Sequence, residues 1–244
     1  YIGDDARCPY GPRTDEEVIA FTLEMIEALQ ALQVKLVVIA CNTATAAALP
    51  IAQDRFPFPI VGVIEPGART ALQVSESNDI LVLGTIGTVN SGAYQEAILR
   101  TMPSATVHSK ACPKFVPVVE SGRYHTAEAE TVVFETMQEI SYTNYDTVIL
   151  GCTHYPLLAS HIQKFVGKEV HVISSATETI VDVERLLRQM GLKNFEQQRT
   201  LRFFTTGPVE KFRAIVKDWL QLENPRVEKI NLQQTIHSKG RQTL

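Results

Sequence analysis

Residues 34–46 read VKLVVIACNTATA, and this stretch decides how the whole chain is interpreted. The apolar run from Leu36 to Ala40 is rich in Val and Ile, which predicts a buried β-strand. Cys41 follows the run at once, and beyond Asn42 and Thr43 a series of alanines predicts a helix. A strand that passes directly into a helix is the repeating unit of α/β proteins, so the stretch indicates that class.

The same alternation continues along the chain. Further apolar runs that predict strands lie at 59–64, 79–85, 114–121, 146–152, 169–175, 201–207 and 226–232. Patterns that predict helices lie at 14–32, 44–49, 65–73, 91–100, 127–140, 157–165, 178–190 and 209–220. This order predicts a mostly parallel arrangement, in one sheet or two, with helices on both faces. The turn-rich residues 65–67 are interpreted as a hinge, and the polar tail 233–244 as a frayed end.

Composition limits the classes of function. The chain has 244 residues, of which 45% are hydrophobic and 20% are charged, as in ordinary soluble globular proteins. Its formal net charge of −4 argues against nucleic acid or a membrane surface as partner, because both favour a basic face. No apolar run reaches the roughly 18 residues of a membrane-spanning helix.

The chain contains four cysteines, Cys8, Cys41, Cys112 and Cys152. They are too few for a disulfide scaffold and form no C-x-x-C pair, so we expect reduced thiols in a cytoplasmic protein. Cys8 and Cys112 adjoin prolines in turn-like stretches and are interpreted as structural. The Cys and His spacings do not match a zinc-ligand pattern, so we expect no metal site.

Two segments resemble each other: LVVIACNTATAAALP around Cys41 and TVILGCTHYPLLASH around Cys152. In each, a strand ends in a small residue, a cysteine follows, and threonine stands before a helix. Ligands of open α/β sheets bind beyond the carboxyl ends of the strands, where helix N-termini favour anions. We therefore expect both thiols at a ligand site with a lowered pKa. Asn42, Thr43, Thr153 and His154 are candidates to cap the helices or to donate to a carboxylate.

Two thiols in one site suit a two-base proton transfer at carbon, in which one takes a proton and the other returns one to the opposite face. His154 is a candidate proton shuttle. A single Cys–His pair would instead suit acyl transfer, and a strand-end cysteine by itself is commonly core. Thr85 and Thr88 also follow a strand; they either line the pocket or cap a helix. The segment GTIGTVNSG that contains them lacks the GK[ST] of a phosphate loop.

Five motifs in this order resemble the glutamate racemases of the cofactor-independent aspartate/glutamate racemase family: CPYGPR (8–13), ACNTAT (40–45), VGVIEPGA (61–68), ACPKFVPVVESG (111–122) and LGCTHYPLL (150–158). The resemblance implies an isomerase that interconverts L- and D-glutamate, supplies D-glutamate for peptidoglycan, and uses no cofactor. It also implies a cytoplasmic homodimer. The implied fold is two similar α/β domains with the active site in the cleft between them. The domains would comprise 1–66 plus 178–244, and 67–177.

The resemblance also assigns roles to residues of this chain. Cys41 would deprotonate D-glutamate and Cys152 L-glutamate. The implied catalytic residues are Cys41, Cys152, His154, Glu120 and Asp4. The implied substrate-binding residues are Tyr10, Gly11, Asn42, Thr43, Thr85, Thr88, Thr153 and His154.

One motif of the family does not occur in the chain. The family begins with a strand and a D-S-G-V-G-G loop whose Asp and Ser contact the substrate, and we expect such a segment to precede Tyr1. Three other hypotheses stay open: a two-cysteine racemase for aspartate or hydantoins, a hydrolase or amidotransferase that uses Cys152 with His154, and a protein that binds a ligand without catalysis.

Overall fold

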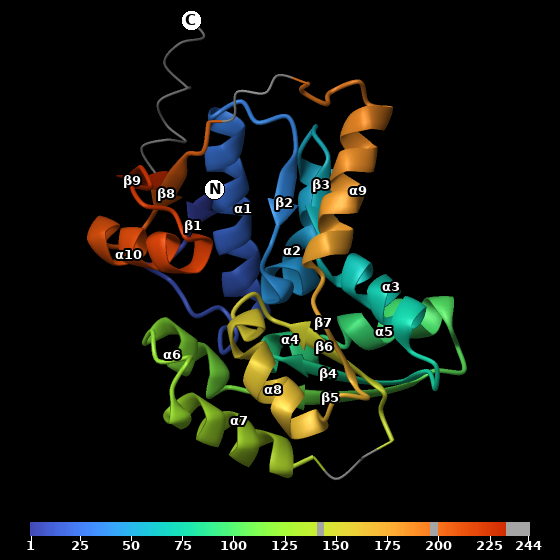
Figure 1. The fold of residues 1–244 in the computed structure, drawn as a ribbon. Helices are drawn as coiled ribbons and strands as arrows, with labels where there is room; N and C mark the ends of the chain where they lie inside the picture. The colour runs from blue at the N-terminus through green and yellow to red at the C-terminus, as the bar shows by residue number, and fades with distance from the viewer. Residues whose placement is uncertain (141–143, 196–199, 233–244) are drawn as a thin grey trace, which may run out of the picture.

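In the computed structural model the described residues are 1–140, 144–195 and 200–232. They form nine strands in three sheets, and all pairings between these strands are parallel. The upper part of Figure 1 contains a three-stranded sheet, β1-β8-β9, and a two-stranded sheet, β2-β3; the lower part contains the four-stranded sheet β5-β4-β6-β7. The strands are β1 Ile2–Gly3, β2 Val37–Ile39, β3 Ile60–Gly62, β4 Asp79–Gly84, β5 Thr106–Ala111, β6 Thr147–Gly151, β7 His171–Ile173, β8 Phe203–Thr205 and β9 Val227–Lys229.

Helices cover the sheets of both parts. They are α1 Asp15–Ala31, α2 Asn42–Arg55, α3 Ile64–Val74, α4 Ile86–Asn90, α5 Ala93–Thr101, α6 Phe115–Glu120, α7 Ala127–Gln138, the 3₁₀ helix η1 Tyr155–Leu158, α8 Ala159–Val166, α9 Ala176–Gln189 and α10 Val209–Leu220. Helices α1, α2, α9 and α10 lie in the upper part, and α4 to α8 lie in the lower part (Figure 1). Helix α3 contacts both α9 and β6 and so lies between the parts. No described helix is long and apolar enough to cross a membrane.

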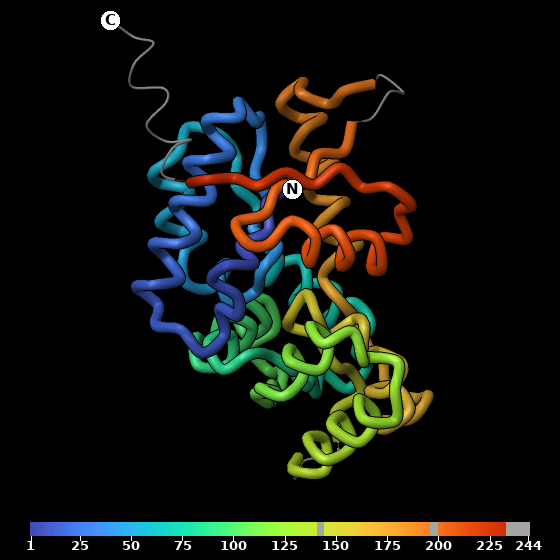
Figure 2. The backbone as a smooth tube through the Cα atoms, turned by 90° about the vertical axis from the view of Figure 1, so that its left-hand side faces the viewer, coloured from blue at the N-terminus to red at the C-terminus, as the bar shows by residue number. Residues whose placement is uncertain are grey.

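The predicted α/β class with parallel strands is confirmed. The first and last described strands share one sheet in the upper part, because β1 pairs with β8 and β8 pairs with β9; in Figure 2 the N label lies among the orange and red segments. The predicted domain boundaries at 66/67 and 177/178 fall inside α3 and α9, and they stay a prediction. The tail 233–244, predicted to fray, lies outside the described residues.

One local prediction is wrong. The strand predicted at 114–121 is the helix α6, Phe115–Glu120, since a short apolar run suits a buried helix equally well. The strand of this region is β5, which the apolar pattern missed because it lies at the edge of its sheet and has the polar sequence TVHSKA.

The hinge at 65–67 stays a prediction. These residues lie in the first turn of α3, where proline is tolerated because its missing N–H has no helical acceptor.

The first helix begins where its sequence predicts. The Thr14 hydroxyl accepts from the Glu17 backbone N–H, and the Glu17 carboxylate accepts from the Thr14 N–H, which together form a capping box. Asp15, Glu16 and Glu17 place negative charge against the positive end of the helix dipole. Helix α1 then packs on α2 and so supports the helix that follows Cys41.

Two paired glycines fix the approach of the two central strands of the lower sheet. Gly84 at the end of β4 pairs with Gly151 at the end of β6. A Cβ on Gly151 would lie 2.8 Å from the Leu83 carbonyl oxygen, so the two strand ends approach too closely for any larger residue. The buried Tyr155 hydroxyl contacts the carbonyl oxygens of Gly84 and Cys112, both at 3.0 Å. The ends of β4, β5 and β6 are thereby tied to one point.

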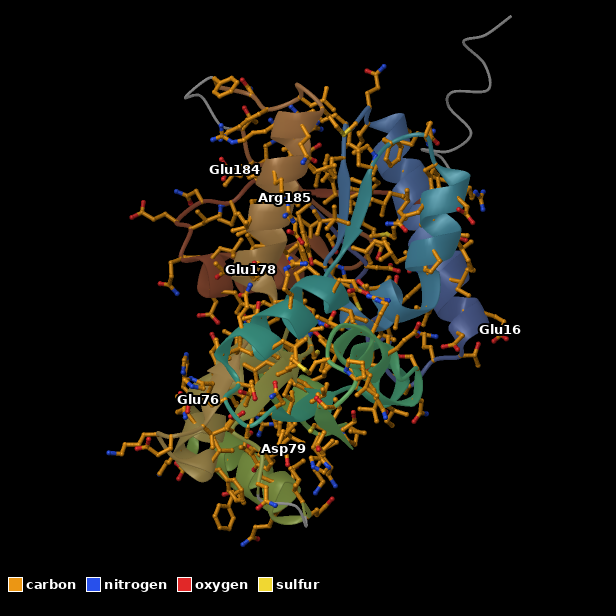
Figure 3. All side chains as sticks on the ribbon, turned by 90° about the vertical axis from the view of Figure 1, so that its right-hand side faces the viewer. Glu16, Glu76, Asp79, Glu178, Glu184 and Arg185 are labelled. Carbon is orange, nitrogen blue, oxygen red and sulfur yellow. The ribbon has the colours of Figure 1, made fainter. Side chains whose placement is uncertain are left out.

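The opposite end of the lower sheet is held by one carboxylate. Asp146 accepts hydrogen bonds from the Ser75 hydroxyl at 2.6 Å, from the backbone N–H groups of Glu76 and Ser77 at 2.8 and 2.7 Å, and from the Thr147 hydroxyl at 2.9 Å. Figure 3 labels Glu76 in this loop, which joins α3 to β4. Partial burial acts to raise the pKa of Asp146, but these donors outweigh it and hold the pKa well below its usual range.

We predict that Asp146→Asn lowers the free energy of unfolding at pH 7 by about 2 kcal/mol, because an amide keeps only one accepting oxygen and loses the charge. A carboxyl whose folded pKa is depressed stabilises the fold above its unfolded pKa of about 3.9 and loses this contribution as the pH falls below it. Urea titrations at a series of pH values should therefore show the two proteins converging from pH 5 to pH 2. Asp54→Asn on the exposed face of α2 serves as control. A difference that stays constant down to pH 2 would contradict the assignment.

Candidate active site

The two cysteines singled out by the sequence occupy equivalent positions. Cys41 is the N-cap of α2 after β2, and Cys152 stands between β6 and η1. Cys41 makes no capping hydrogen bond, but the backbone N–H groups two and three residues on, at Thr43 and Ala44, lower its pKa. At the corresponding positions after Cys152, the backbone N–H groups of His154 and Tyr155 lower the pKa of that thiol. Each sulfur therefore faces the start of its helix, where a thiolate would find donors.

Burial outweighs these donors at both sulfurs. It raises the pKa of Cys152 to about 12 and also raises the pKa of Cys41. A charge on Cys41 raises the pKa of Cys152 further, so the two thiols interact. The expectation of a lowered thiol pKa is therefore wrong in sign for the free protein.

His154 stands between Cys152 and a carboxylate. Its Nδ1 lies 3.7 Å from the Cys152 sulfur, and its Nε2 lies 2.9 Å from Glu120 Oε1. The His154 hydrogen bond is the main reason that the pKa of Glu120 is lowered, and the charge of Lys211 lowers it as well. This arrangement orients the imidazole toward the sulfur, as a carboxylate does for the histidine of a catalytic pair.

Three threonines join the two parts of the molecule. The Thr43 hydroxyl at the start of α2 lies 2.8 Å from the Thr85 hydroxyl and 3.2 Å from that of Thr88, which are 3.1 Å apart. Thr85 is also the N-cap of α4 and accepts from the Thr88 N–H. Thr85 therefore caps a helix, as one of the two alternatives predicts, and it also faces Thr43 across the parts; the pocket-lining role of Thr85 and Thr88 stays a prediction.

Asn42 and Gly11 lie beside this group. The buried Asn42 accepts with Oδ1 from the Tyr94 hydroxyl at 2.7 Å, which leaves its Nδ2 group as a donor. The Gly11 carbonyl accepts from the Gly87 N–H at 2.9 Å, and a Cβ on Gly11 would lie 2.7 Å from the Thr85 Cβ. Gly11 thus permits a close approach of the first loop to α4.

Asp4 and Thr153 are the remaining predicted residues. Asp4 is engaged by Arg7 Nε at 2.7 Å, by the Tyr10 hydroxyl at 2.5 Å and by the Thr206 hydroxyl at 2.6 Å. These contacts support the loop after β1. Thr153 is exposed next to Cys152. The catalytic and binding roles of all these residues stay predictions.

Sequence reasoning missed three residues at this site. Cys8, interpreted as structural, interacts electrostatically with Cys41, Cys152 and Glu120, and burial raises its pKa to about 12. Its place beyond the end of β1 was the available signal. Lys211 and Trp219 of α10 belong to no recognisable sequence motif. Lys211 contacts Glu120, and the Trp219 ring packs edge-on against the His154 ring, with 5.5 Å between the ring centroids. Cys112 is in the core, as predicted.

A hollow on the outer side of α1 lies apart from this site. It contains no cysteine or histidine, so the chemistry at the strand ends does not extend to it. Its lining residues are Glu16, Ile19, Ala20, Leu23, Glu24, Glu27 and Arg55. Among the described residues, no group of three or more His, Cys, Asp or Glu side chains could hold a metal ion.

Comparison with known proteins identifies the class. The model of the Asp/Glu/Hydantoin racemase family matches residues 1–183, so the chain belongs to that family. It is accordingly an isomerase, an amino-acid racemase. A glutamate racemase of Listeria monocytogenes is 50% identical over 233 residues, which are 95% of this chain and 88% of the relative.

Solved structures agree with the fold. Glutamate racemase isoform RacE1 from Bacillus anthracis matches with a TM-score of 0.91 and 43% identity, over 95% of this chain and 87% of the other. Glutamate racemase from Francisella tularensis, solved in complex with D-glutamate, matches with a TM-score of 0.88 and 31% identity over the same shares. The two-part α/β architecture is therefore the racemase fold.

We predict slow alkylation of Cys152 by iodoacetamide in the native protein. Since only the thiolate reacts and burial raises this pKa, the rate should rise about tenfold per pH unit from pH 7 to pH 9. Site-resolved mass spectrometry measures the rate, and the protein unfolded in urea provides the reference of an ordinary thiol. A plateau below pH 8 in the native protein would contradict a raised pKa.

Proposed function

We propose that this chain is a glutamate racemase that works with two cysteine bases. The observation that carries the proposal is the equivalent placement of Cys41 and Cys152, each at the end of a parallel strand and facing the N–H groups two and three residues on. A hydrolase would need one thiol with a histidine and leaves the second thiol unexplained. Glutamate as substrate is supported by relatives at 50% identity.

The proposed reaction moves one proton off the substrate and one onto it. With L-glutamate, His154 first takes the proton of the Cys152 thiol. The Cys152 thiolate then takes the α-proton and becomes a thiol again, and the Cys41 thiol gives its proton to the opposite face of the carbanion. D-glutamate, a Cys41 thiolate and a protonated His154 result, and the reverse reaction exchanges the roles of the two cysteines. The high thiol pKa values suit this step, because a strong base is needed for a weak carbon acid.

Fixed donors would hold the substrate carboxylates. The Asn42 Nδ2 group and the hydroxyls of Thr43, Thr85 and Thr88 lie between the parts of the molecule, and we propose that they bind one carboxylate. Charge that develops on the carboxylate during proton removal is stabilised by such preorganised donors. Exposed Thr153 and the loop of Tyr10 and Gly11 complete the proposed binding set, and Glu120 with His154 assists Cys152.

The proposal includes the finer features that the family resemblance implies. These are the division into 1–66 plus 178–244 and 67–177, a homodimer, a cytoplasmic location, a role for Asp4 in catalysis, and supply of D-glutamate to peptidoglycan synthesis. Sedimentation velocity of the purified protein would test the dimer.

We predict that Cys41→Ser and Cys152→Ser each reduce racemisation on the order of a thousandfold or more, because a hydroxyl is a far weaker acid than a thiol and neither ionises to take the α-proton nor gives its own proton to the carbanion. Circular dichroism of L- and of D-glutamate during incubation measures the rate. In deuterated water the wild-type protein should place deuterium at the α-carbon of the product.

Three outcomes would exclude this proposal. If Cys41→Ser kept the catalytic activity of the wild-type protein, this result would favour a single-cysteine mechanism, as in a hydrolase. Conversion of aspartate without conversion of glutamate would assign a different substrate. Binding of glutamate with no α-proton exchange in the wild-type protein would indicate a binding protein. Cys112→Ser, in the core, is the matched control for the loss of a thiol.

A further inference from the structure

One face of helix α10 contacts the lower part of the molecule. Lys211, Asp218 and Trp219 are seven and eight residues apart and therefore lie on one face of the helix. Each of them has a partner in the region around Cys152. Lys211 Nζ lies 3.5 Å from Glu120 Oε2, Asp218 Oδ2 accepts from the Tyr124 hydroxyl at 2.5 Å, and the Trp219 ring meets His154.

The rest of α10 fixes the helix in the upper part. Phe212 and Val216 are buried there with Phe203 and Val227 of the neighbouring strands. The helix is thus attached to the β1-β8-β9 sheet on one side and presents Lys211 toward the other part of the molecule. None of the predicted catalytic residues lies on this helix.

Lys211 joins two carboxylates from opposite parts. Its Nζ lies 2.8 Å from Asp5 Oδ1 in the loop after β1, in addition to its contact with Glu120 of α6. The Asp5 side chain is only 7% exposed and packs against Gly207, where a Cβ would lie 2.2 Å from Asp5 Oδ2. A carboxylate that is buried and immobile in this way holds the lysine ammonium in place, although Lys211 itself is half exposed.

The contacts continue from Glu120 to the sulfur. One oxygen of Glu120 faces Lys211 and the other faces His154 Nε2, whose ring directs Nδ1 to Cys152. We propose that Lys211 is a positioning residue for proton transfer at Cys152: it holds one oxygen of Glu120, so that the other fixes the His154 ring beside the sulfur. This inference rests on the function proposed above.

The charged and titratable groups around Lys211 agree with this role. Asp5 and Cys8 face it from the loop after β1, and Glu120 faces it from α6. Contacts with Asp5 and Glu120 raise the pKa of Lys211, so it stays protonated throughout the working pH range. Its charge lowers the pKa of Glu120 and of Cys8.

The first test compares Lys211→Met with Lys211→Arg and with Lys217→Met, which removes an exposed lysine from the same helix. We expect kcat/KM to fall roughly tenfold in Lys211→Met, to recover to within about threefold of wild type in Lys211→Arg, and to stay unchanged in Lys217→Met. Because the two enantiomers of glutamate have equal free energies, kcat/KM must fall equally in both directions.

The second test follows the thiols themselves. Site-resolved alkylation with iodoacetamide at pH 8 gives the rates of Cys152 and Cys41 in one sample. In Lys211→Met the ratio of the Cys152 alkylation rate to the Cys41 alkylation rate should fall about threefold, since the His154 imidazole is no longer fixed beside the Cys152 sulfur. A merely structural lysine would expose both thiols and increase both rates together.

The outcomes separate the two proposals. An unchanged alkylation ratio in Lys211→Met, or equal acceleration at both thiols, overturns the positioning role. Wild-type kcat/KM in Lys211→Met overturns it as well. If the wild-type protein does not racemise glutamate, the proposed function fails, while the alkylation ratio still decides whether Lys211 acts on Cys152.

Discussion

The close parallel approach of β4 and β6 is the constraint on which the rest of the site depends. Gly84 and Gly151 pair at the strand ends, and Tyr155 bonds to the carbonyl oxygens there. The residues that follow the two glycines are Thr85 and Cys152, so the register fixes the strand ends from which a helix-capping hydroxyl and a thiol extend. The Thr85 hydroxyl contacts that of Thr43 in the upper part. A shift of one residue in this pairing would turn the side chains of one strand to the opposite face relative to the other strand.

Burial and hydrogen bonding act in opposite directions on the thiols. Helix starts provide N–H groups for a thiolate, yet removal from water raises the pKa of both cysteines. A thiol whose pKa is raised is a stronger base once it has lost its proton. Proton transfer at a weakly acidic carbon needs that property more than it needs a thiolate at rest. The His154–Glu120 pair acts on one thiol only, so the two halves of the site are chemically unequal.

The sequence predicted the strand–cysteine–helix units and the α/β class because these depend on local patterns. It predicted α10 at 209–220, but it gave no reason to connect Lys211 or Trp219 with the active site, since their partners are distant in sequence. Strand β5 was missed because an edge strand needs no apolar run. Thiol pKa values could not be read from motifs either, because the motif gives the donors and only the fold gives the burial.

The pairing of Ile2 with Phe204 has a consequence for how the protein is made. Strand β1 cannot join its sheet until the β8 segment has been translated, on the order of ten to forty seconds later at ordinary elongation rates. The four-stranded sheet, by contrast, consists of residues 79–173 and can close earlier. Helix α10 is translated after β8. Assembly of the reactive centre therefore waits for the segment that contains α10, and a polypeptide terminated before that segment carries both thiols without the parts that organise them.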